Sequence, residues 1–64
     1  MKRRALLALL QDHGCVPFRE GSNHSIWMNP VTGRKEAVPR HNEVKKHLAR
    51  KICLSLSVEP PAGD

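Results

Sequence analysis

Residues 15–39 read CVPFREGSNHSIWMNPVTGRKEAVP, and this stretch determines the fold class. Three short segments rich in β-branched and aromatic residues, at 15–20, 24–28 and 34–38, alternate with turn residues and predict three strands. Short connections of this kind join neighbouring antiparallel strands, so the sheet should be a meander. Pro17 cannot donate a ladder hydrogen bond, which indicates that the first strand lies at the edge of the sheet.

The segments on either side of this stretch have the pattern of helices. Residues 3–13 are rich in Leu and Ala, and Gly14 stands where a left-handed helix cap is expected. Residues 43–56 should form the second helix, with Asn42 as its N-cap. Its expected buried stripe recurs every four residues and consists of Val44, Leu48, Ile52 and Leu56.

This order predicts an α+β protein, an α-β-β-β-α two-layer sandwich like the double-stranded-RNA-binding domain. The sheet is three-stranded and antiparallel, and both helices should cover one face of it. In the second strand His24, Ile26 and Met28 share one face, whereas Ser25 and Trp27 share the other. The pattern leaves open which face the helices cover, and therefore whether Trp27 is buried or exposed.

The length of 64 residues allows one small domain, which we expect over residues 1–56, followed by a flexible tail over 57–64. The apolar run 5–10 is too short to span a bilayer, and no cleavage site follows it, so we expect a cytoplasmic protein without membrane attachment. Cys15 and Cys53 lack metal-ligand spacing. We expect them to be core residues, and we expect no metal and no small-molecule cofactor.

The charge of the chain favours a polyanionic partner. The chain has 11 Lys and Arg against 6 Asp and Glu, a net charge of +5. Residues 34–51 hold seven of the basic residues and two of the acidic ones, and the cluster 2–4 adds three more cations. A basic surface that only maintains solubility is the alternative. The candidate RNA-binding cations are Arg34, Lys35, Arg40, Lys45, Lys46, Arg50 and Lys51.

His24 is the first candidate for chemistry, because it follows a Gly-Ser-Asn turn and begins a strand. An imidazole titrates near neutral pH, so it can exchange a proton with the 2′-hydroxyl of RNA, which is already positioned to attack the neighbouring phosphate. Ser22 and Asn23 could orient that phosphate, and Arg40 could bind it at the start of the second helix. A surface or turn role for these residues is the alternative.

Two motifs together make the chain similar to a known family. The Gly21-Ser-Asn-His24 turn and the Val38-Pro-Arg-His41 segment, placed after a Leu-rich first helix, resemble the HicA toxins of bacterial toxin–antitoxin systems. The resemblance covers about residues 2–56. Asn23 is a departure, because many members place the His directly after the Ser.

The resemblance implies a toxin that cleaves mRNA as a metal-independent endoribonuclease and thereby inhibits translation. It also implies that His24 is the catalytic residue and that a HicB-like antitoxin protein covers the active site. Two other interpretations stay open at this point. One is a non-catalytic RNA-binding module with the same fold, and the other is a small protein whose basic face binds an acidic partner.

Overall fold

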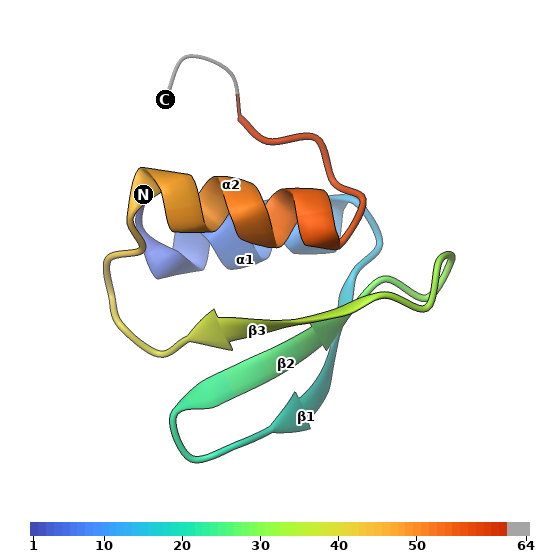
Figure 1. Ribbon diagram of the computed structural model, residues 1–64, viewed down its shortest axis with the longest axis horizontal. Helices are drawn as coiled ribbons and strands as arrows, with labels where there is room; N and C mark the ends of the chain where they lie inside the picture. The colour runs from blue at the N-terminus through green and yellow to red at the C-terminus, as the bar shows by residue number, and fades with distance from the viewer. Residues whose placement is uncertain (62–64) are drawn as a thin grey trace.

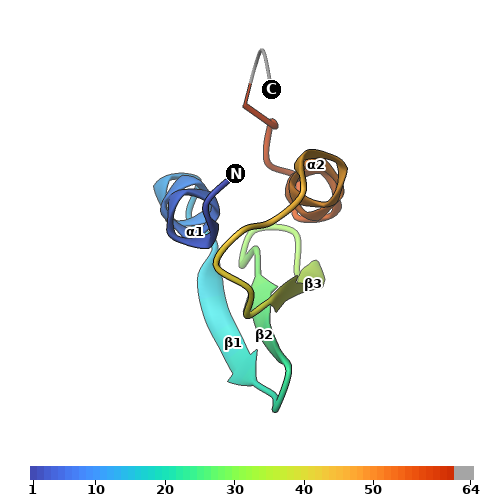
Figure 2. The ribbon, with the colours of Figure 1, turned by 90° about the vertical axis from the view of Figure 1, so that its left-hand side faces the viewer.

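The computed structural model describes residues 1–61. The elements are α1 (Arg3–Asp12), β1 (Val16–Glu20), β2 (His24–Met28), β3 (Lys35–Pro39) and α2 (Lys46–Ser55). Figure 1 shows both helices above the sheet, and Figure 2 shows them side by side on the same face of it. The predicted α-β-β-β-α two-layer sandwich is therefore confirmed.

The sheet has the order β1-β2-β3, and both pairings are antiparallel. β1 is an edge strand, as Pro17 predicts, and its register with β2 shifts between Pro17 and Arg19. This shift is a bulge, in which β1 has one residue more than β2 between the paired positions. Between β2 and β3 the register is regular, and His24 stands opposite Pro39.

The helices cover the face of β2 that carries Ser25 and Trp27. Both residues are buried, as is Val38 on β3, and α2 packs on β3. Trp27 is thus a core residue, and His24 lies on the opposite, uncovered face with Ile26. The buried core consists of Leu6, Leu10, Cys15, Trp27, Val38, Val44, Ala49, Ile52, Cys53, Leu56 and Val58.

The second helix begins later than the sequence pattern predicts. It starts at Lys46, and Lys45 rather than Asn42 is the N-cap, so the predicted start was wrong. The backbone of the preceding residues pairs with the first residues of the chain: Arg3 N–H donates to the Asn42 carbonyl over 2.8 Å, and Lys2 forms an isolated bridge with Glu43. This pairing holds the segment extended, which excludes the helical conformation.

Both helices end in the same capping motif. After α1, Gly14 has a φ of +84°, and Cys15 N–H donates to the Leu10 carbonyl. After α2, Ser57 has a φ of +58°, and Val58 N–H donates to the Cys53 carbonyl. This is the Schellman pattern, in which the residue after the left-handed position closes the helix and contacts it.

Val58 is consequently buried, so the packed part of the chain extends at least two residues beyond residue 56. The predicted flexible tail also includes residues 62–64, which lie outside the described residues.

Candidate functional site

His24 lies at the end of the sheet where β2 begins, directly after the Gly21–Asn23 turn. Its side chain is exposed on the uncovered face. Gly21 N–H donates to the His24 carbonyl over 2.8 Å, which closes the turn and fixes the backbone of His24. A Cβ at Gly21 would lie 3.2 Å from that carbonyl oxygen, so a larger residue there would disturb the position of His24.

A chain of polar contacts lies behind this turn. Arg40 Nη2 donates to Glu20 Oε1 (2.5 Å) and to the Gly21 carbonyl (2.6 Å). The hydroxyl of Ser25 donates to the same Glu20 oxygen over 2.9 Å. Arg3 Nη2 donates to the Ser25 hydroxyl over 3.0 Å, and Arg3 Nε donates to the Pro39 carbonyl over 2.8 Å. These contacts join α1, β1, β2 and the segment after β3 at the point where His24 stands.

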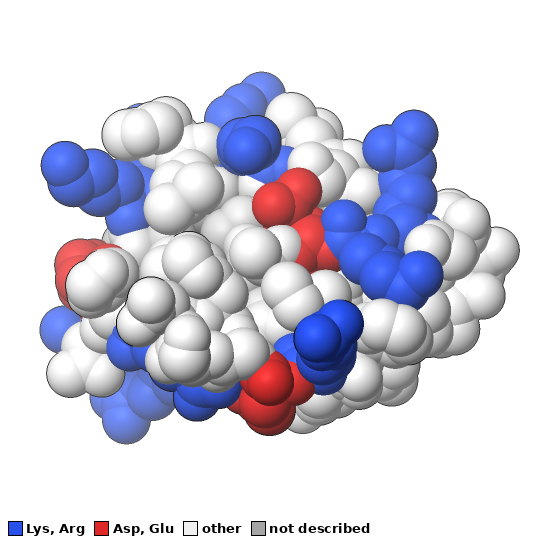
Figure 3. Space-filling view, turned by 60° about the horizontal axis from the view of Figure 1, so that its bottom comes forward, with Lys and Arg blue, Asp and Glu red and all other residues white. Residues whose placement is uncertain are grey.

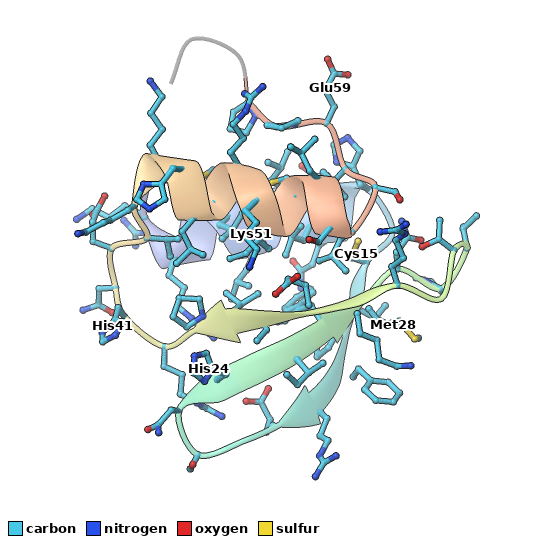
Figure 4. The ribbon with its side chains drawn as sticks, viewed as in Figure 1. Cys15, His24, Met28, His41, Lys51 and Glu59 are labelled. Carbon is cyan, nitrogen blue, oxygen red and sulfur yellow. The ribbon has the colours of Figure 1, made fainter. Side chains whose placement is uncertain are left out.

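The starts of both helices lie at the same end of the molecule as His24 (Figure 4). Neither helix has a side-chain hydrogen bond at its N-cap, which is Lys2 for α1 and Lys45 for α2. The first N–H groups of a helix carry partial positive charge, so two uncapped starts and their cations favour an anion at this end. His41 lies here too, on the connection between β3 and α2 (Figure 4).

The structure brings together some of the predicted RNA-binding residues and separates others. Ser22, Asn23 and Arg40 are exposed at the His24 turn. Lys45 and Lys46 begin α2, and the exposed cations Arg50 and Lys51 follow further along that helix. Arg34 and Lys35 stand at the other end of β3. Lys35 pairs with Met28, four residues along β2 from His24, which corresponds to about 13 Å of strand.

The open side of the molecule carries both uncharged and charged surface. Figure 3 shows white areas between Lys and Arg, which lie at the margins and also right of centre, and small acidic patches. Phe18 is exposed on β1, and the Lys35 ammonium lies 4.7 Å from the centre of its ring. Lys35 therefore makes a cation–π contact with an aromatic residue of the sheet.

The sequence did not predict Glu20 and Ser25 as members of the site, because their role depends on contacts between segments. Arg3 belongs to the N-terminal basic cluster that the charge pattern did detect. The structure places this cluster around a shallow hollow at the His24 end, lined by Lys2, Arg3, Arg4 and Asn42.

The two cysteines are buried in the core and unpaired within residues 1–61. Burial raises the pKa of the Cys15 thiol, and burial together with the proximity of Cys15 raises the pKa of the Cys53 thiol. No cluster of three or more His, Cys, Asp or Glu suited to a metal ion occurs in the described part of the chain. No helix within residues 1–61 is long and apolar enough to cross a bilayer.

A comparison with protein families identifies the chain. A model described as the HicA toxin of bacterial toxin–antitoxin systems matches residues 3–57, nearly the whole length. The chain belongs to the HicA toxin family. Comparisons with curated proteins and with solved structures gave no match. Membership confirms the resemblance of the two motifs, and it makes the chain the toxin component of a system that also has an antitoxin.

Proposed function

We propose that this HicA toxin is a metal-independent endoribonuclease that cleaves mRNA and so inhibits translation, with His24 as its catalytic acid and base. The observation that carries the proposal is the exposed His24 at the end of the molecule where Arg40 and two uncapped helix starts also lie. An enzyme that acts on mRNA works in the cytoplasm, which is the location we propose.

The reaction requires no nucleophile from the protein. His24 accepts the proton of the ribose 2′-hydroxyl, and the 2′-oxygen attacks the adjacent phosphorus atom. The bond from phosphorus to the 5′-oxygen then breaks, and the imidazolium returns its proton to that leaving oxygen. The products are a 2′,3′-cyclic phosphate and a 5′-hydroxyl.

Positive charge near His24 stabilises the transition state of this reaction. Negative charge increases on the phosphate oxygens as the 2′-oxygen attacks, and fixed hydrogen-bond donors stabilise it most effectively. The guanidinium of Arg40, which is bound to the Gly21 carbonyl, and the exposed Ser22–Asn23 turn next to His24 are the donors that we assign to this role. Lys45, Lys46, Arg50 and Lys51 extend the cationic surface along α2, where they would bind the flanking phosphates.

The antitoxin partner is proposed to be a HicB-like protein with an acidic surface that covers His24. A net charge of +5 accelerates association with an acidic protein. Covering the exposed imidazole would be sufficient to stop cleavage.

The test is a cleavage assay with end-labelled RNA and a DNA strand of the same sequence. We expect cleavage of RNA alone, unchanged activity in EDTA, and cyclic or 3′-phosphate ends on the products. His24→Ala should reduce the rate by a factor of at least about 100. His13→Ala is the matched control, because His13 is also exposed but lies at the opposite end of α1.

Cleavage of the DNA, loss of activity in EDTA, or a fully active His24→Ala protein would contradict the mechanism. Binding of RNA without any cleavage by the native chain would instead support the non-catalytic RNA-binding module, which the same basic surface allows.

A further inference from the structure

Glu20 has an unexpected position for an acidic residue of an RNA-cleaving protein. Its carboxylate lies beside the His24 turn, where a negative charge opposes the approach of phosphate. The carboxylate is exposed, and exposed ion pairs contribute little to stability, so its pairing with Arg40 is a weak explanation in terms of folding alone.

The carboxylate is nevertheless held in place from behind. The hydroxyl that donates to Glu20 belongs to Ser25, which is only 2% exposed. Ser25 in turn accepts a hydrogen bond from Arg3, whose guanidinium is also bound to the Pro39 carbonyl. Because Pro39 stands opposite His24 in the sheet, this contact fixes Glu20 relative to the strand that carries the imidazole.

Glu20 orients the Arg40 side chain but does not use all of its hydrogen-bond donors. Within residues 1–61 its hydrogen bonds to Glu20 and to the Gly21 carbonyl both come from Nη2. The donors on Nε and Nη1 make none among these residues. A guanidinium carries five N–H donors, so the three on Nε and Nη1 can still donate single, charge-assisted hydrogen bonds to phosphate oxygens.

We propose that Glu20 is a positioning residue for phosphate binding: it holds Arg40 at the His24 turn, with Ser25 and Arg3 holding Glu20 in place. This inference rests on the proposed ribonuclease function. Without Glu20 the long Arg40 side chain samples many conformations, and the fraction that can meet the scissile phosphate falls.

The sign of the effect distinguishes this role from simple electrostatics. Glu20→Ala should lower the single-turnover cleavage rate about tenfold, although it removes a negative charge from an RNA-binding face. Glu59→Ala is the matched control, because Glu59 is exposed and points away from the sheet (Figure 4), and it should leave the cleavage rate unchanged. Glu20→Gln keeps an acceptor oxygen and should recover most of the rate.

A double-mutant cycle tests whether Glu20 acts through Arg40. In the Arg40→Ala background, Glu20→Ala should have little further effect on the rate, because the residue that it positions is gone. Additive effects in the cycle, or a Glu20→Ala protein that binds and cleaves RNA better than the native chain, would overturn the inference.

The inference can also be tested apart from cleavage. If Glu20→Ala does not fold, Ser25→Ala, which removes the hydroxyl that donates to Glu20, takes its place in the cycle with Arg40→Ala. If the native chain binds RNA without cutting it, the proposed function fails, and RNA affinity becomes the deciding measurement. Glu20→Ala should then bind RNA more weakly than Glu59→Ala, and equal or tighter binding overturns the positioning role.

Discussion

The two ends of the molecule treat their backbone polar groups in opposite ways. At the end with the β2–β3 loop, both helices finish in Schellman motifs, and the buried Asn29 amide donates to the Leu56 carbonyl over 2.8 Å. The Asn29 side-chain oxygen also accepts a hydrogen bond from Val31 N–H. At the end with His24, both helices begin without side-chain caps.

This contrast indicates where the molecule can accept a ligand. At the Asn29 end, the polar side chain of Asn29 forms hydrogen bonds with backbone groups of the protein itself. The His24 end has no side-chain cap on either helix, although the Asn42 carbonyl accepts from the first N–H of α1. Because both helices run in the same direction, their positive ends add there (Figure 1). The fold therefore separates a structural end from an end suited to bind an anion.

The largest effect expected on stability comes from Asn29. Asn29→Ala leaves the buried Leu56 carbonyl without its donor, so the free energy of unfolding should fall by about 2 kcal/mol. Denaturant unfolding measures the loss, and the cleavage rate of the folded fraction should be native. His24→Ala should show the reverse, with native stability and little activity. A His24→Ala protein that loses as much stability as Asn29→Ala would contradict the separation of the ends.

The next effect concerns RNA affinity. These measurements use the inactive His24→Ala protein, so that the RNA is not cleaved. In this background, replacing Lys45 and Lys46 by Gln should reduce the slope of log Kd against log salt concentration by about 0.7 for each phosphate that is no longer bound. Replacing Arg34 and Lys35 should flatten it less with a short RNA, because these two lie at the Asn29 end of β3. Titrations from low to moderate salt give the slopes. Equal flattening by both pairs would extend the binding surface over the whole sheet.

A smaller stability effect should come from the end of α2. Ser57 adopts a left-handed conformation that Gly adopts without steric penalty, so Ser57→Gly should raise the free energy of unfolding by about 1 kcal/mol. Gly14→Ala, at the equivalent position after α1, should lower it by a similar amount. Thermal or denaturant unfolding compares the two variants. Destabilisation by Ser57→Gly would show that the Ser side chain itself supports this end.

The smallest effect should come from Glu43 at the His24 end. Hydrogen bonds from the Met1 amino group and then from Lys2 lower the pKa of its carboxyl group. A lowered pKa means that the charged form stabilises the folded state at neutral pH and that this contribution is lost as the pH falls through that pKa. The melting temperature of Glu43→Gln should therefore be slightly below that of the native chain at pH 7. In acid the two proteins should have the same melting temperature. A difference that does not change with pH would assign the effect to packing.

Most of the architecture could be predicted from the sequence. The three strands follow from their composition and from the turn residues between them, and the end of α1 follows from Gly14. The start of α2 could not be predicted, because Asn42 is a good N-cap in isolation, and only pairing with residues at the other end of the chain holds it extended. The burial of Trp27 was open for a similar reason, since both faces of β2 carry large apolar residues.

The candidate site was predictable only in part. His24 and its turn were evident because Gly, Ser, Asn and His in this order have both a turn preference and a chemistry. The contacts among Arg3, Glu20, Ser25 and Arg40 come from four segments that no local pattern connects. Glu20 is one of few acidic residues in a basic protein, which marks it for attention, but its contact with Arg40 exists only in the folded chain.

The irregular β1 strand has a consequence for how the protein behaves at high concentration. An edge strand with free N–H and C=O groups can template a strand from another molecule, which leads to aggregation. Here Pro17 removes one donor, the register shift follows it, and Arg19 places a charge beside the break. A second chain would find no continuous ladder along β1, so this edge of the sheet resists edge-to-edge association.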